Sequence, residues 1–361
     1  MYIYIVLWEI FNTVLSQIEI PLVKGLGTYD IRLFINNNPT FRQFLPDMEC
    51  DVMYITRDNS IIEDIPTIPK EGFLMQSNFL LGYNFTTPLL KKFPYKVIEK
   101  EPSSFIGINH FPLGFFIKDE SMSFVHQLYN EGRIAKKGFT LYINQSVEKA
   151  TLFIGKQPKS LIEEFQYNYN ISIQVNTNYS NWGCRLDSIS FGTEFYQIDR
   201  YAYFQGGKQK IWIPRRVYNY LESTLFKPYL ANYTCFTIMA MDGVSFQCKC
   251  AQIFFFPNIT FTLNGNKIEL SMRELFDGFY GMCVSSFISG KDEKYDKWIL
   301  GLPFFRKYII YFDYENQDIT FYSQIPFEKH LPHTHIFYIM ISCLSLCIIN
   351  TILLLYAKFK L

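Results

Sequence analysis

Few residues of this chain have the type and spacing that catalysis requires, and the common catalytic motifs are missing from it. The sequence contains no His-Glu-x-x-His, no Gly-x-Ser-x-Gly, no phosphate-binding loop and no Cys-x-x-Cys pair. His330, His333 and His335 could capture a metal, but a solvated linker is the simpler interpretation. We expect neither a metal nor a cofactor.

Composition places the chain among folded proteins and excludes one class of partner. Its 361 residues are 49% apolar, enough to bury one or two large cores. The net charge of +1 gives no electrostatic support for binding nucleic acid. Aromatic residues reach 18%, but Phe, Tyr, Ile, Asn and Lys are all frequent, which indicates a base-composition bias rather than a binding role.

Apolar segments at both ends predict a membrane-anchored protein of the secretory pathway. Residues 1–17 are expected to be a signal peptide, with an N-terminal anchor as the alternative. Ile336–Ala357 has 22 residues without a charge, enough for a helix that crosses a ~30 Å hydrocarbon core. Two lysines in the tail at 358–361 fit a cytosolic end. We therefore expect a type I membrane protein with its body in the lumen or outside the cell.

The body between these segments carries signs of an oxidising compartment. Six of the eight cysteines lie in it, an even number that suggests disulfide bonds. Six glycosylation sequons, absent from the apolar segments, support the same location. The sequons are at Asn84, Asn144, Asn170, Asn178, Asn232 and Asn258.

The stretch Ala202–Leu221 has a pattern of its own. Apolar residues lead into Gly206-Gly207, and an apolar strand leaves this pair before Pro214 and a helix-like segment. The pattern resembles the second active-site loop of the pepsin-like aspartic peptidases, peptidase family A1. In that alignment Gln205 stands where the family has its second catalytic aspartate.

The first active-site motif of the family is expected in Phe41–Ile55. Aligning the end of this stretch with the family motif places Pro46 at the catalytic position and Met48 at the position of the motif glycine. A shift of one residue would instead make Asp47 the acid. That shift changes the length of a tight loop and still supplies no glycine for the turn. We therefore expect Asp47 to be a solvated turn residue.

Other stretches extend the resemblance over about residues 20–325. Trp298–Phe321 is the most specific, with about thirteen positions that agree at unbroken spacing, although Leu302 stands where an Asp is common. Ser104–Ile108 resembles the segment that crosses behind the first loop, through Ile106-Gly107. Phe73 lies in the region of the family's flap but lacks the usual tyrosine hydroxyl.

The resemblance implies an all-β, bilobal fold with a cleft between the lobes, followed by the transmembrane helix. We expect an N-terminal lobe at 18–178, a C-terminal lobe at 179–325 and a stalk at 326–335. It also implies a second-lobe disulfide between Cys250 and Cys283. Cys235 with Cys248 forms a plausible further bond, and Cys50 and Cys184 remain paired or free.

In the family, two aspartates share one proton and hold the attacking water between them. Neither Pro46 nor Gln205 can perform that exchange, so the sequence predicts a pseudopeptidase that binds an extended peptide or a protein in its cleft. Two alternatives stay open. One is an active aspartic endopeptidase with a site rebuilt around Asp47, and the other is a diverged surface glycoprotein whose cleft is vestigial.

Overall fold

The computed structural model describes most of the body of the chain and leaves both ends undescribed. The described residues are 17–24, 29–35, 41–48, 53–56, 73–80, 90–98, 109–114, 120–144, 149–179, 181–239, 243–290 and 297–324. The predicted signal peptide, stalk, Ile336–Ala357 and the histidine cluster lie outside these residues. Within them, no helix has the length and apolar character needed to cross a membrane.

Two mixed β-sheets form the molecule, and the first has twelve strands among the described residues. Its outer strands come from distant parts of the chain. Strand β21 (Ile309–Asp313) pairs with β8 (Gly138–Asn144), and β22 (Asp318–Ser323) pairs with β10 (Tyr169–Gln174). In order across the sheet, these strands are β10 (Tyr169–Gln174), β22 (Asp318–Ser323), β21 (Ile309–Asp313), β8 (Gly138–Asn144), β9 (Lys149–Gly155), β1 (Gln17–Lys24), β2 (Tyr29–Ile35), β3 (Phe41–Asp47), β7 (Asn109–Pro112), β4 (Tyr54–Thr56), β6 (Leu90–Ile98) and β5 (Phe73–Leu80).

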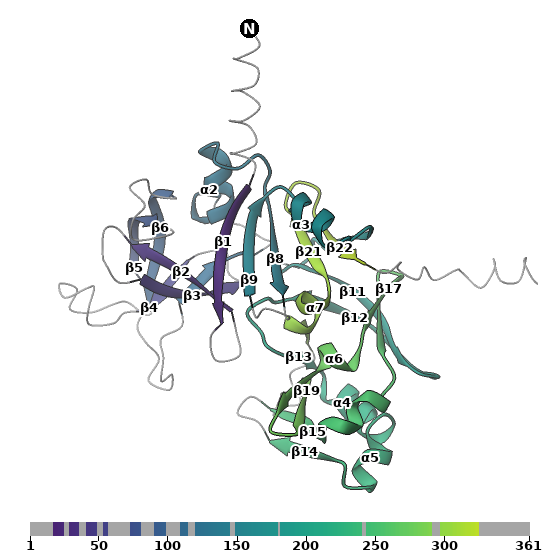
Figure 1. Ribbon diagram of the computed structural model, residues 1–361. Coiled ribbons are helices and arrows are strands. Elements are labelled where there is room, and N and C mark those ends of the chain that lie inside the picture. The colour runs from purple at the N-terminus through teal and green to yellow at the C-terminus, as the bar shows by residue number, and fades with distance from the viewer. Residues whose placement is uncertain are drawn as a thin grey trace, which may run out of the picture.

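The second sheet has ten described strands and lies in the lower part of Figure 1. In β16 (Ile259–Leu263), the residues Ile259, Phe261 and Leu263 are buried, and the two threonines between them are half-buried. The strands are β14 (Cys235–Met239), β15 (Val244–Lys249), β19 (Met282–Ser289), β13 (Ile211–Ile213), β20 (Trp298–Leu300), β12 (Glu194–Phe204), β11 (Gly183–Phe191), β16 (Ile259–Leu263), β17 (Asn266–Leu270) and β18 (Phe276–Phe279).

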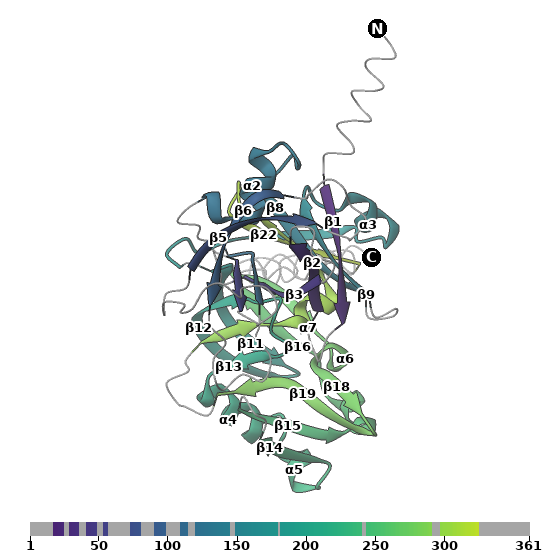
Figure 2. The ribbon, with the colours of Figure 1, turned by 90° about the vertical axis from the view of Figure 1, so that its left-hand side faces the viewer.

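Short helices connect the strands and cover the edges of the sheets. Figure 2 shows α4 and α5 at the end of the molecule remote from α2. The helices are η1 (Glu120–Met122), α2 (Phe124–Asn130), α3 (Lys159–Glu164), α4 (Arg215–Ser223), α5 (Lys227–Ala231), η3 (Cys250–Phe255), α6 (Met272–Leu275) and α7 (Leu302–Lys307). The predominance of strands agrees with the all-β expectation, and the two sheets are consistent with a pepsin-like fold.

The same four-strand arrangement occurs once in each sheet. In the first sheet, β3 runs parallel to β7, β7 meets β4 through the antiparallel pair His110–Tyr54, and β4 runs parallel to β6. In the second, β12 runs parallel to β20, β20 meets β13 through the antiparallel pair Ile299–Trp212, and β13 runs parallel to β19. The molecule therefore contains two topologically equivalent halves, one for each loop discussed above.

Aromatic side chains pack where the two sheets meet. Trp182 is fully buried, and its ring packs edge-on against Phe312 and Tyr314 with centroids 5.2 and 4.8 Å apart. Its indole N–H donates to the carbonyl oxygen of Leu113 at 2.8 Å. A large aromatic that is also satisfied by a hydrogen bond ties the start of the second sheet to the first.

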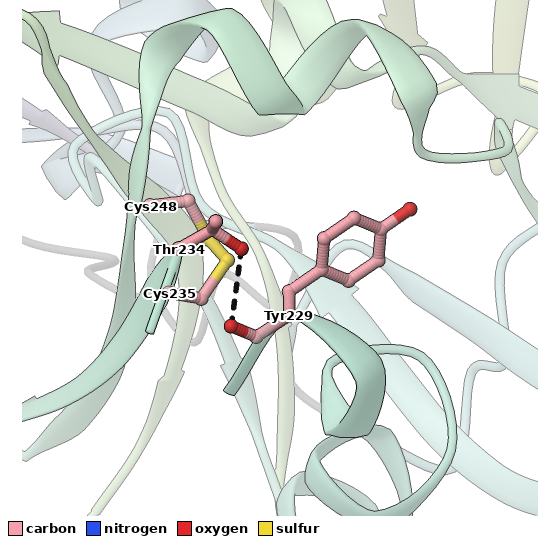
Figure 3. The surroundings of a disulfide bond; sticks show 4 residues. All are labelled: Tyr229, Thr234, Cys235 and Cys248. Carbon is pink, nitrogen blue, oxygen red and sulfur yellow. Dashed lines mark hydrogen bonds between the residues drawn. A yellow bond between two sulfur atoms is a disulfide. The ribbon is translucent and has the colours of Figure 1, made fainter. Parts of the chain in front are cut away.

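Both expected disulfides are present, and both lie in the second sheet. Cys235 is bonded to Cys248 across neighbouring strands, and Cys250 is bonded to Cys283. Figure 3 shows the first bond beside Thr234, whose hydroxyl donates to the carbonyl oxygen of Tyr229 at 3.1 Å. The two bonds therefore fasten neighbouring strands and turns at one end of this sheet.

Candidate functional site

Gln205 lies at the end of β12, in a loop built as the sequence predicted. Its backbone N–H donates to the carbonyl oxygen of Leu300 at 3.0 Å, which continues the parallel pairing of β12 with β20. The N–H of Lys208 donates back to the carbonyl oxygen of Gln205 at 3.1 Å and closes a turn over the Gly-Gly pair. The chain then enters β13, Pro214 and α4. The Gln205 side chain is 3% exposed.

A glycine of the neighbouring segment makes room for this loop. The N–H of Leu302 donates to the carbonyl oxygen of Lys208 at 2.9 Å, so the two backbones pass very close to each other. A Cβ on Gly301 would collide with the carbonyl oxygens of Lys208 and Lys210. The Ile-Leu-Gly-Leu segment therefore needs a glycine to support the loop.

The two loops are joined by hydrogen bonds that cross from one half to the other. The backbone N–H of Met48 donates to the Oε1 atom of Gln205 at 3.0 Å. In return, the backbone N–H of Gly206 lies 3.1 Å from the Sδ atom of Met48, which accepts weakly. The N–H of Gly207 also reaches Gln205 Oε1, at 3.5 Å. One side chain from each loop thus satisfies a buried donor of the other loop.

Met48 is the partner that sequence reasoning missed. The motif alignment places Met48 only at the position of a glycine. In the structure Met48 is 1% exposed, and its Sδ atom accepts a hydrogen bond from the Gly206 N–H across the site. The interaction depends on which loops face each other, so no local pattern around Met48 could have revealed it.

Strand register gives the first loop an alignment different from the one expected. In the second half, Phe204 pairs with Leu300 and Gln205 follows Phe204. In the first half, His110 takes the place of Ile299, because each makes the single antiparallel pair of its four-strand arrangement, so Phe111 takes the place of Leu300. Pro46 pairs with Phe111, and Asp47 follows Pro46. Asp47 therefore has the topological position of Gln205.

Loop length gives the same equivalence. Asp47 precedes Tyr54, and Gln205 precedes Trp212, by the same number of residues. Tyr54 and Trp212 are the residues that make the equivalent single antiparallel pairs. The expected objection to the one-residue shift, a change in loop length, therefore does not hold.

One further expectation about this region needs correction. Asp47 is the last residue of β3 and pairs with Pro112, so it is a strand residue and not a turn residue. The cause of this error is that the strand that pairs with β3 is distant in sequence, so the register of β3 is not visible locally. Asn109–Pro112 forms the strand beside β3, and Ile106-Gly107 lies outside the described residues.

The remaining predicted site residues have these positions. Pro46 is buried in β3. Phe73 begins β5, which forms an antiparallel hairpin with β6. The side chains of Phe73 and Asp47 are not among the described parts of the structure.

Positive charge stays outside the buried centre of the site. Lys208 is exposed, and its Nζ atom lies 6.0 Å from the ring centroid of Trp212, over the face of the ring. Leu302, at the position where the family commonly has an Asp, is fully buried at the start of α7. No group of three potential metal ligands occurs among the described residues. The described centre can donate and accept hydrogen bonds through amide groups, but Gln205 cannot exchange a proton.

Outside the site, the sequons and remaining cysteines are placed as follows. Asn170, Asn178, Asn232 and Asn258 are exposed, and Asn144 is half-buried at the end of β8, whereas Asn84 and Cys50 lie outside the described residues. Cys184 is a free, buried thiol, and burial raises its pKa, which makes it an unreactive core residue.

Comparison with known proteins identifies relatives of this chain. A family model described as eukaryotic aspartyl protease matches residues 106–324, more than half of the chain. Plasmepsin I of Plasmodium falciparum, found in two isolates of that organism, is 24% identical over 314 residues, which cover 80% of this chain. The chain spans 65% of the length of these curated relatives. The family match includes Gln205 but begins after Asp47.

Proposed function

Because this chain belongs to the eukaryotic aspartyl protease family, we propose that it is a catalytically inactive member that binds an extended peptide in the cleft between its two halves. The observation that carries the proposal is the amide of Gln205 at the centre of the site. Its Oε1 atom accepts the Met48 N–H and so serves as a structural bridge.

An amide at the position of the second catalytic aspartate matters because hydrolysis requires proton transfer. Hydrolysis by a pair of carboxyl groups needs one group to take a proton from water while the other donates one to the substrate. An amide does neither at any physiological pH. Loss of general acid–base catalysis lowers rates by about 10²–10⁴. Asp47 would remain as a single carboxyl group, because Gln205 offers no second one to share its proton.

A membrane-anchored location in the secretory pathway completes the proposal. Two disulfides in the second sheet are typical of proteins that fold in an oxidising compartment. The apolar segment Ile336–Ala357 would hold the peptide-binding body at a membrane.

One alternative keeps a specific observation in its favour. The register equivalence of Asp47 with Gln205 supports a carboxylate at the first catalytic position, which a rebuilt active site would need. That alternative requires a second acid in place of Gln205. The third hypothesis is a surface glycoprotein with a vestigial cleft, and it predicts no peptide binding.

The test uses the full chain in detergent, incubated with a fluorogenic peptide library from pH 4 to pH 7, with and without pepstatin. We expect no cleavage, together with saturable binding of extended peptides. Cleavage that disappears in Asp47→Asn but persists in the neighbouring control Asp51→Asn would establish the active alternative. Absence of both cleavage and peptide binding would favour the vestigial cleft.

A further inference from the structure

A pocket of about 520 Å³ opens on the face of β21 that points away from the main core. Tyr311 and Asp313 line it from the strand, whereas Ile310 and Phe312 of the same strand belong to the main core. The volume is within the range of pockets that hold small molecules. Lys159 and Ser160 of α3 form one wall of the pocket. Figure 1 shows α3 beside β21.

Two glycines and a tyrosine give the pocket a fixed frame. Tyr311 is 1% exposed, and a Cβ on Gly138 would occupy the place of its ring and hydroxyl. The hydroxyl of Tyr311 donates to the carbonyl oxygen of Gly155 at 3.3 Å. Gly155 has a φ of 117°, which L-amino acids rarely adopt. The turn after β9 is therefore held against β21, and it carries Lys156–Ser160 into the pocket wall.

The lining carries an excess of positive charge. Lys136, Lys156 and Lys159 all line the pocket, and none has a carboxylate within 4.0 Å among the described residues. The carboxylate of Asp313 is engaged elsewhere: it accepts from the backbone N–H groups of Glu315 and Asn316, at 2.8 and 3.0 Å. Its other oxygen accepts from the Asn316 side-chain amide at 2.9 Å. Three lysines therefore face the pocket with one carboxylate, which already accepts three hydrogen bonds from its own loop.

We propose that this pocket binds a compact ligand that carries several phosphate groups. Lysines act as point charges that suit phosphate, and three of them around one pocket suit a ligand with several negative charges. The Ser160 hydroxyl and the Gln157 amide add neutral donors. The site lies outside the pseudo-symmetric centre and does not depend on whether the cleft binds or cleaves peptides.

The experiment measures binding to the full chain with three probes. The chain is kept in detergent for the two soluble probes and in amphipol for the vesicles, because detergent would dissolve them. Inositol hexakisphosphate represents a soluble ligand, and vesicles of phosphatidylcholine with phosphatidylinositol 4,5-bisphosphate represent a lipid headgroup. Inorganic phosphate measures the contribution of a single anion. The variants are Lys136→Ala/Lys156→Ala/Lys159→Ala and, as a matched control, Lys227→Ala, an exposed lysine on α5 in the second half.

Saturable binding of the hexakisphosphate is expected at 0.15 M salt, with weaker binding of inorganic phosphate. The triple variant should lose about 100-fold or more in affinity, and Lys227→Ala should bind as the wild type does. Affinity should also fall as salt rises, because exposed lysines are screened. Vesicle binding in addition would identify a lipid headgroup, and its absence a soluble ligand. Absence of saturable binding to every probe, or equal binding by the triple variant, would overturn the proposal.

Discussion

The two halves of the candidate site share one strand arrangement and differ in the residues at their centres. In the second half, Gln205 is followed by a glycine pair and supported by Gly301. In the first half, Asp47 is followed by Met48, and Pro112 takes the place of that supporting glycine. The family match covers the second half and does not reach Asp47.

The backbone geometry of this site can therefore be kept while its chemistry changes. Strand pairing fixes the backbone of each half, because parallel neighbours position both loop ends. The reactive group depends on one side chain, which can change without altering the pairing. The two halves stay joined with the present side chains, because Gln205 Oε1 accepts a hydrogen bond from the first loop and Met48 Sδ accepts one from the second loop.

The largest effect should come from making the second half acidic. Gln205→Asp would place a carboxyl group opposite the position proposed for Asp47, and a shared proton would again be available. We expect cleavage that requires acidic pH, is inhibited by pepstatin and exceeds that of Gln205→Asn by about 10²–10⁴. Gln205→Asn is the matched control, since it has the size of Asp without its charge. Equal activity in both variants would show that the first half lacks a usable acid.

Removing the disulfides should destabilise the second half strongly. The chain-entropy estimate for Cys250→Ser/Cys283→Ser, whose cysteines are 33 residues apart, is about 4 kcal/mol. For Cys235→Ser/Cys248→Ser, whose cysteines are 13 residues apart, the same estimate is about 3 kcal/mol. Denaturant unfolding measures both values. A larger loss from the shorter loop would contradict the entropic explanation.

Substitutions at Met48 should separate packing from hydrogen bonding across the centre. Met48→Ala removes a buried side chain and should cost about 3 kcal/mol of unfolding free energy. Met48→Leu keeps the volume but leaves the Gly206 N–H without its acceptor, at a cost of about 1 kcal/mol. Denaturant titration of both variants measures the packing contribution and the hydrogen-bond contribution to the unfolding free energy. A neutral Met48→Leu would mean that the sulfur contact contributes nothing.

The smallest effect concerns pH, and it belongs to the first half, since residues 183–300, which include every described strand of the second sheet, contain no histidine. Burial, and next the nearby Lys137, lower the pKa of His126, while Glu120 opposes them. His126 also contacts the Ser123 hydroxyl through Nδ1 and the ring of Tyr314. The unfolded chain therefore takes up this proton at a higher pH than the folded chain does.

The stability that neutral His126 contributes is complete above the ordinary histidine pKa of about 6.5 and declines as pH falls below it. His126→Gln should lose less stability than the wild type between pH 7.5 and pH 5. Unfolding measured across that range checks this, and the change should be smaller than those above. Parallel curves for both proteins would exclude His126 as the cause.

Several features could be predicted from the sequence because their signals are local. The loop around Gln205 has its Gly-Gly pair, strand, proline and helix in consecutive order, and the structure shows this order. The Trp298–Phe321 segment forms β20, α7, β21 and β22 at its expected spacing. The family resemblance implied the bond between Cys250 and Cys283, and Cys235 with Cys248 was a plausible further pair; both bonds are present.

Tertiary structure alone decided the alignment of the first loop and the identity of its partner across the centre. The position of Asp47 follows from the pairing of Pro46 with Phe111, and the role of Met48 follows from its contact with Gln205, 157 residues away. A shift of one residue along a strand exchanges its two faces and is decided by the neighbouring strand. The sequence by itself therefore determined the kind of fold and the amide at residue 205, whereas long-range strand pairing decided what that amide faces.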